Sequence, residues 1–375
     1  KATGYHGFFY HFLDMQTGLR YDATVELSSI DTSLLLAGML FSQSYYDRDT
    51  AIEREIRKLA ERIYQRVDWT WMRPRPPLVS MAWAPESGFS DYDWEGYNEA
   101  MLLYILALGS PTHALEPSVW QAWTRTYDDA RGTFQGYTFL NFGPLFGHQY
   151  SHAWIDFRGI RDAWMRRHDS TYFRNSRCAV RAQRAYAIDN PNHWVGYGAR
   201  LWGLTASNGP GDFAFEVGGH ERTFHGYWAR GAGLDYFQDD GTIAPTAAAA
   251  SIAFAPEIAI AAIDAMIKDY GQYIYGKYGF LDAFNPSFRN AEVTPRSGRV
   301  VPGLGWVDSK YLGIDQGTIL LMLENYRSDF VWEVMRRNPY VRRGLERAGF
   351  TGGWLKATRA STQDAQDEKA QAVVQ

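Results

Sequence analysis

Apolar residues recur at helical spacing along most of the chain, whereas alternating strand patterns are few. The spacing predicts helices over residues 27–41, 51–67, 97–108, 119–129, 153–166, 174–188, 255–269, 317–326 and 330–336. Only residues 136–140 and 299–301 suggest short strands. The 97–108 segment is apolar nearly all round, so we expect it at the centre of the fold.

Long segments rich in Gly, Pro, Trp, Tyr and Asp separate these helices, at residues 69–96, 190–245 and 277–315. Such long loops are uncommon unless they carry function or are disordered, and their aromatic content argues against disorder. About a dozen helices allow six hairpins of roughly 60 residues each. We therefore predict one all-α domain at residues 1–355, an (α/α)6 barrel with its loops around one mouth, and a polar tail at residues 356–375. A helical solenoid is the alternative, but the sequence has no fixed period.

Composition narrows the class of protein. Aromatic residues make up 16% of the 375 residues, and 38 basic against 42 acidic residues leave no positive excess for nucleic acid. No apolar run reaches the roughly 18 residues of a membrane span, and the single Cys178 cannot form an internal disulfide. No signal peptide is visible, but the chain begins at Lys1 without a Met, as after removal of a leader.

Familiar cofactor and nucleophile motifs are absent from the sequence. It contains no GxGxxG, GxxxxGK[ST], GxSxG, HExxH or CxxC, so nucleotide, serine-nucleophile, zinc-protease and thiol chemistry have little support. His148 and His152 have the spacing of a metal-binding pair, although hydrogen-bonding histidines are the commoner outcome. We expect neither a metal nor a cofactor.

Carboxylates set among aromatic residues are the remaining candidate chemistry. Glu95 and Glu99 are spaced one helical turn apart, so we expect them at the same mouth. Glu95 is alternatively a plain charge at a helix N-terminus. Glu99 adjoins Ala-Met-Leu-Leu, where a carboxylate is hard to solvate, and this favours a buried functional acid as much as a structural one.

Three further acidic residues have a structural alternative to a functional role. Asp156 and Arg158 flank an aromatic residue, where they line a pocket or form a structural salt bridge. Asp315 lies at the entry of the 317–326 helix and is either catalytic or an N-cap. Asp240 belongs to an Asp-Asp-Gly sequence that is most simply a turn.

This combination suits the binding and cleavage of sugars. Pyranose rings present an apolar C–H face that stacks on Trp or Tyr, while their hydroxyls bond to polar side chains. Hydrolysis needs one carboxylic acid to protonate the leaving oxygen and a second carboxylate to activate water or act as nucleophile. A carboxyl holds a proton near neutral pH only when its pKa is raised.

Seven motifs carry a resemblance to a known family, from about residue 7 to residue 355. They are GFFYHFLD at 7–14, SIDTSLLL at 29–36, GYNEAMLLYILALGSPTH at 96–113, PLFGHQYSH at 144–152, WGLTAS at 202–207, DGTIAPT at 240–246 and GIDQG at 313–317. Together they resemble the bacterial glucoamylase-like family that contains the β-1,2-glucanases, glycoside hydrolase family 144. The resemblance implies an (α/α)6 barrel, no obligatory metal, inverting hydrolysis of a β-linked glucan, and a location in the periplasm or outside the cell.

The resemblance also ranks the candidate residues, without separating acid from base. Glu99 and Asp315 are the best matches to the family's carboxylates at the barrel mouth, and Asp156 and Glu95 follow. The residues that we expect to bind substrate are Trp94, Tyr97, Asn98, His148, Tyr150, His152, Arg158, Trp202, Asp240 and Trp306.

Two positions depart from the family pattern. Arg174, in the sequence YFRNSR, stands where the family commonly has Glu. If that Glu is the family's acid, this chain uses another acid such as Glu99, cleaves a different linkage or transfers glycosyl groups. Asn208 stands where the family often has Asp, which indicates an altered subsite.

The leading hypothesis is a hydrolase of a bacterial β-glucan, above all a β-1,2-linked one, linear or cyclic. The alternatives are a transglycosylase, a hydrolase of a different linkage, and a non-catalytic toroid that binds carbohydrate. The partner that we expect is an oligo- or polysaccharide substrate, and no protein partner is implied.

Overall fold

The computed structural model describes residues 3–356 and is mainly helical. Apart from Lys356, the predicted polar tail lies outside the described residues. The helices are α1 (Ser29–Tyr45), α2 (Ala51–Gln65), α3 (Met101–Gly109), α4 (Ser118–Trp123), α5 (Tyr127–Ala130), α6 (Phe146–Trp154), α7 (Ala163–Arg167), α8 (Tyr172–Asp189), α9 (Pro245–Ala249), α10 (Pro256–Ile274), α11 (Gly313–Ser328), α12 (Phe330–Arg336) and α13 (Pro339–Arg347), with 3-10 turns at Thr124–Thr126 and Gly353–Leu355.

Short antiparallel strands occupy the long loops, so the all-α prediction was too simple. Gly-rich loops return on themselves and pair locally, which satisfies their backbone groups without a helix. The strands are β1 (Gly4–Tyr5), β2 (Phe8–Phe9), β3 (Leu27–Ser28), β4 (Ala82–Ala84), β5 (Gly88–Phe89), β6 (Arg131–Phe134), β7 (Tyr137–Leu140), β8 (Ile160–Arg161), β9 (Ala206–Ser207), β10 (Phe213–Val217), β11 (His220–Phe224), β12 (Trp228–Ala229), β13 (Gly231–Ala232), β14 (Phe237–Gln238), β15 (Tyr275–Gly276), β16 (Gly279–Phe280), β17 (Phe284–Asn285), β18 (Arg299–Val301), β19 (Gly305–Val307) and β20 (Thr351–Gly352).

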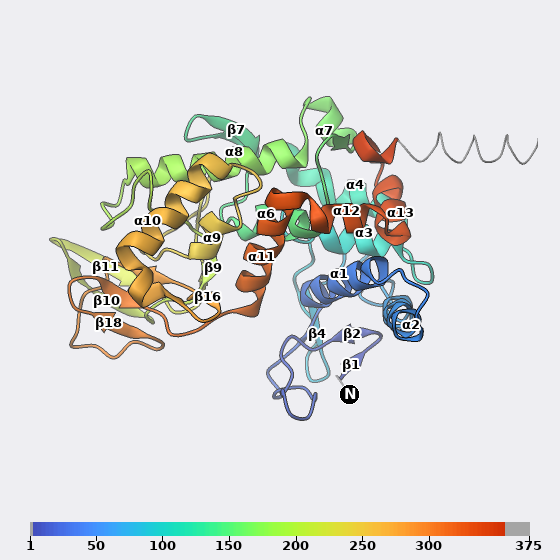
Figure 1. Cartoon of the computed structure of the whole chain (residues 1–375), viewed down its shortest axis with the longest axis horizontal. Coiled ribbons are helices and arrows are strands. Elements are labelled where there is room, and N and C mark those ends of the chain that lie inside the picture. The colour runs from blue at the N-terminus through green and yellow to red at the C-terminus, as the bar shows by residue number, and fades with distance from the viewer. Residues whose placement is uncertain (1–2, 357–375) are drawn as a thin grey trace, which may run out of the picture.

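Helices α6 and α11 lie in the middle of the molecule and pack against each other (Figure 1). Helices α8 and α10 and the β10–β11 hairpin lie on one side of them, and α1, α2, α3 and α13 lie on the other. Two large groups of buried side chains form the core, and Trp154, Phe173 and Leu321 pack against both. The central helices therefore join the two sides through one continuous apolar interior.

The structure confirms the positions of most predicted helices. Helices α1, α2, α8, α10 and α11 lie within a few residues of their predicted bounds, and α12 agrees at both ends. The predicted 97–108 helix begins only at Met101, because Gly96, with φ of +74°, belongs to a turn before it. The predicted 119–129 helix is interrupted by a 3-10 turn between α4 and α5.

One predicted helix, at residues 153–166, is wrong. Helix α6 ends at Trp154 and α7 begins at Ala163, and the loop between them includes Gly159 with φ of +72°. The apolar pattern missed α6 because its residues 147–153 are all buried, polar ones included, so no amphipathic period marks it. It also missed α9 and α13.

Candidate active site

Glu99 lies in the turn that leads into α3, and neighbouring groups hold its backbone. The Asn98 amide donates a hydrogen bond to the carbonyl of Glu95 at 3.1 Å. From α6, the Ser151 hydroxyl donates to the carbonyl of Glu99 at 3.0 Å. Burial raises the pKa of the Glu99 carboxyl to about 7, and the negative charge of Asp31 adds to the rise.

Asp315, in the first turn of α11, forms a buried pair with Asp282, from the loop between β16 and β17. Burial, and then the hydrogen bond and charge of Asp282, raises the pKa of Asp315 well above its ordinary value. Burial also raises the pKa of Asp282, which accepts the backbone N–H of Asn208 at 2.6 Å. Each carboxyl of the pair therefore keeps its proton to a higher pH than an exposed aspartic acid does. Asp315 is not the N-cap of α11, because that position belongs to Leu312.

The phenols of two tyrosines, Tyr150 and Tyr227, both experience the charges of Glu99 and of this aspartate pair. Burial raises the pKa of the Tyr150 phenol well above its ordinary value, and the charges of Asp315 and Glu99 add to the rise. Tyr227 is 63% exposed, yet partial desolvation of its phenol, followed by the charges of Asp315 and Asp282, raises its pKa to about 12. Because the charges of the three carboxyls act on the same two phenols, we treat these carboxyls as one group. We call Glu99, Asp282 and Asp315 the carboxyl cluster.

Each member of the carboxyl cluster has one carboxyl oxygen without a hydrogen-bond partner among the described residues. Glu99 Oε2, Asp282 Oδ1 and Asp315 Oδ2 are buried and lack a hydrogen-bond partner within residues 3–356. Leaving a buried polar atom unpaired costs roughly 1–3 kcal/mol. Water or the hydroxyls of a ligand would satisfy these oxygens, which marks the cluster as a place for a polar ligand.

Asp31, in the first turn of α1, supplies a further carboxylate beside the cluster. Its Oδ2 accepts a hydrogen bond from the Ser28 hydroxyl at 2.5 Å and lies 3.4 Å from Nε2 of His11. His11 Nδ1 lies 2.8 Å from Oε1 of Glu26, and this bond, helped by the charge of Asp31, raises the pKa of His11 despite partial burial. The N-terminal segment therefore fixes the carboxylate whose charge acts on Glu99.

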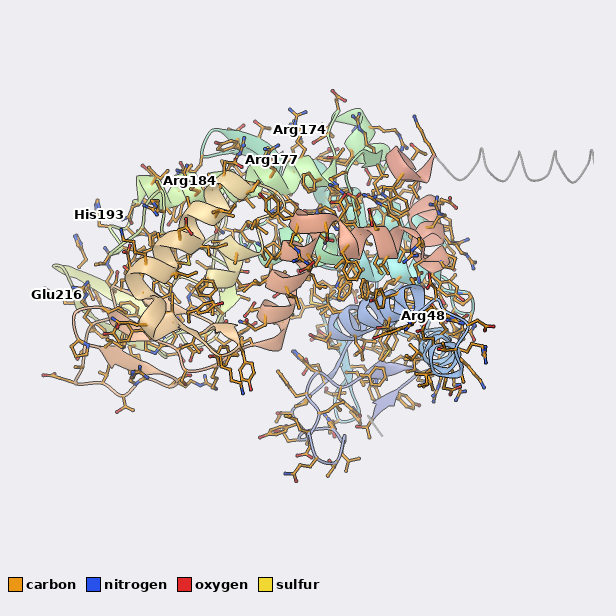
Figure 2. All side chains as sticks on the ribbon, viewed as in Figure 1. Arg48, Arg174, Arg177, Arg184, His193 and Glu216 are labelled. Atoms are coloured by element: carbon orange, nitrogen blue, oxygen red, sulfur yellow. The ribbon has the colours of Figure 1, made fainter. Side chains whose placement is uncertain are left out.

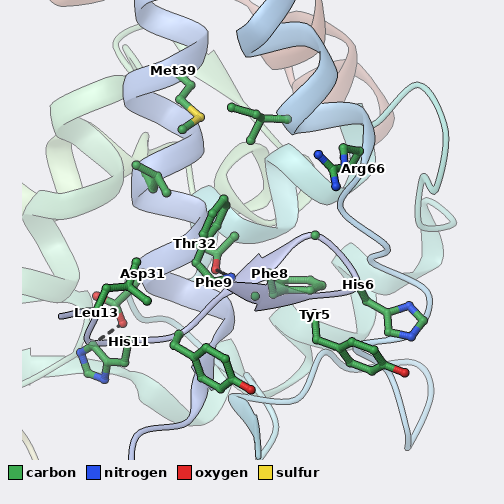
Figure 3. Close-up of a pocket in the computed structure, with 15 residues that line it drawn as sticks. Tyr5, His6, Phe8, Phe9, His11, Leu13, Asp31, Thr32, Met39 and Arg66 are labelled. Carbon is green, nitrogen blue, oxygen red and sulfur yellow. Dashed lines mark hydrogen bonds and ion pairs between the residues drawn. The ribbon is translucent and has the colours of Figure 1, made fainter. Parts of the chain in front are cut away.

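A pocket of about 910 Å³ extends from Asp31 along the flank of α1 (Figure 3). Asp31 and His11 lie at one end of it and Arg66 lies at the other, with Met39 above the β1–β2 hairpin. Its volume falls within the roughly 300–1,000 Å³ typical of ligand sites. The polar end of the pocket holds Asp31, and the negative charge of Asp31 acts on Glu99 of the carboxyl cluster.

The other two acidic candidates lie in ion pairs outside the carboxyl cluster. Glu95 precedes α3 without helical structure, so it is not one helical turn from Glu99, and its carboxylate pairs with Arg125. Asp156 follows the C-terminal end of α6, a helix of nine residues and thus roughly 13 Å long. It is 2% exposed, and its Oδ1 accepts a hydrogen bond from Nε of Arg158 at 2.8 Å. The structural salt-bridge alternative therefore describes this pair.

Tyr97, His148 and His152 form a buried network between α6 and α8. The Tyr97 hydroxyl lies 3.1 Å from Nδ1 of His148, and Nε2 of His152 lies 3.1 Å from the Ser176 hydroxyl. Burial lowers the pKa of His148 to about 3 and lowers that of His152 well below its ordinary value. Both imidazoles are neutral and fully enclosed, so this network supports the fold instead of contacting a sugar.

Three predicted stacking residues belong to the core. Trp202 and Trp306 are fully buried, and Trp94 is nearly so, with its indole N–H donating to the Ser29 hydroxyl at 2.9 Å. None of these rings presents a face on which a sugar can stack. The high aromatic content that suggested sugar binding therefore serves mainly the packing of the interior.

Asp240 has a structural role as well. Its carboxylate receives two hydrogen bonds of 2.7 Å from the guanidinium of Arg230, and both side chains are fully buried. Burial opposes ionisation, but the charge and hydrogen bonds of Arg230 lower the pKa of Asp240 below its ordinary value. Arg230 also donates to the carbonyls of Ser207 and His225, so the pair ties separate loops together.

The two departures from the family pattern lie in different places. Arg174 is exposed on the outer side of α8, as is Arg177 one turn further along the same helix (Figure 2). The absence of Glu at position 174 therefore removes no acid from the carboxyl cluster. Asn208, by contrast, supports the cluster, because its backbone N–H binds Asp282 and its amide donates to Asp308 at 2.9 Å.

Sequence reasoning missed Asp282, Asp31 and Tyr227 as members of the site. Asp282 follows Phe280 and Leu281 and precedes another apolar residue, the same signal of an acid among apolar neighbours that singled out Glu99. Asp31 lies within one of the family motifs, but its sequence position is equally typical of an ordinary acidic residue near the start of a helix. Tyr227 carries no local signal among the many tyrosines.

Neither a group of metal ligands nor a membrane-spanning helix occurs within residues 3–356. No three His, Cys, Asp or Glu side chains in this range are grouped so as to hold a metal ion. No helix in the same range has the length and apolar character to cross a membrane.

Comparison with known proteins relates the chain to glucan-cleaving enzymes. Residues 91–339 match the Glycoamylase family, described as "Putative glucoamylase". The chain is 28% identical over 380 residues to an exo β-1,2-glucooligosaccharide sophorohydrolase (non-reducing end) of Parabacteroides distasonis. This alignment covers 92% of the chain and 47% of the relative, so the chain spans about half the length of that curated relative.

Solved structures show the same relationship. An endo-β-1,2-glucanase of Chitinophaga pinensis, in complex with sophorotriose and glucose, superposes with a TM-score of 0.78 at 30% identity, over 95% of this chain and 79% of that one. A β-1,2-glucanase of Parabacteroides distasonis superposes with a TM-score of 0.77 at 26% identity, over 93% and 49% of the respective chains.

Proposed function

The chain belongs to the Glycoamylase family, as its motifs indicated, and on this basis we propose that it is a glycoside hydrolase that cleaves a β-1,2-linked glucan. The observation that carries the proposal is the carboxyl cluster, in which Glu99, Asp282 and Asp315 each have a buried oxygen without a hydrogen-bond partner among residues 3–356, and burial raises the pKa of all three. The glucan specificity is taken from the two β-1,2-glucanases and the sophorohydrolase to which the chain is similar.

The cluster supplies both functions that hydrolysis requires. One carboxyl must donate a proton to the leaving glycosidic oxygen while an ionised carboxyl accepts a proton from water. The water oxygen then bonds to the anomeric carbon as the bond from that carbon to the leaving oxygen breaks. We propose that Glu99 and the Asp282–Asp315 pair divide these two tasks.

Because Glu99 has a pKa of about 7, Glu99→Gln removes the limb of the pH–rate profile near pH 7. Loss of the alkaline limb identifies Glu99 as the acid, and loss of the acidic limb identifies it as the base.

We extend the proposal to an (α/α)6 barrel and to inversion of the anomeric configuration, both of which the family resemblance implies. Helices that pack against each other in pairs, such as α1 with α2, α3 with α13 and α6 with α11, support the toroidal arrangement. An inverting enzyme releases the α-anomer from a β-linkage. Proton NMR of the first products distinguishes that outcome from release of the β-anomer, which contradicts inversion.

The experiment for the reaction is incubation of the purified protein with linear and cyclic β-1,2-glucan and a panel of other glucans. New reducing ends from β-1,2-glucan alone support the proposed hydrolase. Changed chain lengths at a constant number of reducing ends indicate a transglycosylase, and cleavage of another glucan indicates a different linkage. Binding without any product supports the carbohydrate-binding toroid and overturns the enzyme proposal. Product lengths separate exo from endo cleavage, on which the relatives differ.

We also propose a periplasmic or extracellular location, which rests on the family resemblance. Fractionation of the native host, followed by immunodetection, tests it directly. Recovery of the protein with the cytosolic fraction would overturn this part of the proposal.

A further inference from the structure

A second cavity, of about 230 Å³, lies between the β10–β11 hairpin and the loops around residues 192–194 and 225–228. This volume is below the roughly 300–1,000 Å³ of sites for drug-sized ligands, so the cavity has room for one small ring. Its lining joins aromatic rings, including Trp228 and Phe237, to polar side chains, including Glu221 and Thr223. Aromatic faces beside hydrogen-bonding groups are the combination that a pyranose ring requires.

The inner wall of this cavity is fixed in place. Asp239 accepts hydrogen bonds from the Trp194 indole N–H at 2.9 Å and from the Tyr197 hydroxyl at 2.7 Å. The guanidinium of Arg222 lies 4.6 Å from the centre of the Trp194 ring. The wall is therefore organised before any ligand arrives, which lowers the entropy cost of binding.

The outer rim, in contrast, has polar groups that are free to bind. The carboxylate of Glu221 and the hydroxyl of Thr223 make no hydrogen bond or ion pair with any described residue. Phe237 is 59% exposed although it lines the cavity, so its ring is accessible to a ligand. A carboxylate and a hydroxyl next to exposed aromatic rings fit the hydroxyls and C–H face of a sugar.

The 225–228 loop links the cavity to the carboxyl cluster without making the cavity part of that cluster. The Arg230 guanidinium donates hydrogen bonds to the carbonyl of His225 at 3.1 Å and to the carbonyl of Asn208 at 3.4 Å, and the backbone N–H of Asn208 binds Asp282 in the cluster. The charges of Asp315 and Asp282 also act on the phenol of Tyr227, in the same loop as His225. His225 and Trp228, on either side of Tyr227 in the sequence, line the cavity. The 225–228 loop therefore lines the cavity and is also connected to the surroundings of the carboxyl cluster.

From this arrangement we propose that the cavity binds one glucose ring of a β-glucan chain whose scissile bond lies at the carboxyl cluster. The identity of the ligand rests on the proposed function. The cavity is then a remote subsite that contributes affinity for long chains, and a short oligosaccharide that fills only the cluster does not reach it.

The test compares long and short substrates in matched variants. We expect Trp228→Ala and Glu221→Gln each to lower the ratio of kcat/KM for linear β-1,2-glucan to kcat/KM for sophorotriose by about 2- to 10-fold. Glu221 is exposed on a hairpin, so its variant reports on binding even if Trp228→Ala impairs folding. Glu216→Gln is the control, because Glu216 pairs with Glu221 across the same hairpin but does not line the cavity. An unchanged ratio in both test variants overturns the subsite.

Affinity electrophoresis in gels that contain β-1,2-glucan separates this inference from the proposed function. If the wild type cleaves neither substrate, the proposed hydrolase fails, and retardation of the wild type but not of Trp228→Ala still supports the subsite. Equal retardation of the two proteins, or none, overturns the subsite whether or not the wild type is active.

Discussion

Burial of Glu99 affects folding as well as chemistry, because the carboxyl binds its proton more tightly in the folded chain. Its pKa is about 7 when folded, against an ordinary value of 4.5. Between these pH values the folded state binds more protons than the unfolded state, so stability falls as the pH rises. A difference of this size corresponds to about 3 kcal/mol between pH 4.5 and pH 7.

Glu99→Gln is expected to remove most of that dependence, since the amide does not titrate. The free energy of unfolding of the variant then changes less between pH 5 and pH 8 than that of the wild type. Urea denaturation at both pH values measures the difference. Parallel pH dependences in the two proteins would show that Glu99 ionises normally.

Asp31 is expected to set part of the pKa of Glu99 through its charge alone. In Asp31→Asn that charge is absent, so the pKa of Glu99 falls and the limb of the pH–rate profile near pH 7 moves to lower pH, by less than about one unit. A pH profile of kcat/KM measures the shift. Glu86→Gln is the control, because this exposed carboxylate pairs with Arg20 and has no effect on Glu99. Coincident profiles for Asp31→Asn and the wild type would contradict the assignment.

Helix α6 carries two histidines whose burial makes the fold sensitive to acid. The pKa of His148 is lowered to about 3, whereas the unfolded chain takes up a proton at about 6.5. As the pH falls from 6.5 towards 3, the unfolded state binds a proton that the folded state excludes, so stability decreases.

His148→Gln is expected to weaken this acid sensitivity, since the amide forms hydrogen bonds but does not titrate. Melting temperatures at pH 7, 6, 5 and 4 measure the slope. The variant is expected to start from a lower melting temperature, because it disturbs a packed network, and to lose less on acidification. A slope equal to that of the wild type would mean that His148 is protonated in the folded state.

The success of sequence reasoning differed between elements for physical reasons. Helix α2 has one apolar and one charged face, so its period is visible, and the prediction matched its start. Helix α6 is buried on all sides and includes polar residues that bond internally, so it has no such period. Of the predicted site residues, Glu99 and Asp315 both act through their charges on Tyr150, whereas the pairing of Asp282 with Asp315 depends on long-range packing that no local pattern records.

At the scale of the whole molecule, the site depends on loops that are distant in sequence. Asp240→Asn is expected to destabilise the protein by about 3–5 kcal/mol, because it leaves the fully buried Arg230 without its charged partner. Thermal or urea denaturation measures the loss. Glu257→Gln, which breaks the exposed pair with Arg181, is expected to cost less than about 1 kcal/mol. Similar losses in the two variants would contradict a structural role for Asp240.

The complete fold brings together carboxyls from the N-terminal, middle and C-terminal parts of the chain, at Asp31, Glu99 and Asp315. The most direct test of this site is the rate of β-1,2-glucan cleavage by Glu99→Gln and Asp315→Asn, with Glu95→Gln as the matched control outside the cluster. With folding verified by circular dichroism, we expect each cluster variant to lose at least about 100-fold in kcat and the control to retain nearly the wild-type rate. Near-normal turnover by either cluster variant, or an equal loss in Glu95→Gln, would contradict the carboxyl cluster as the catalytic centre.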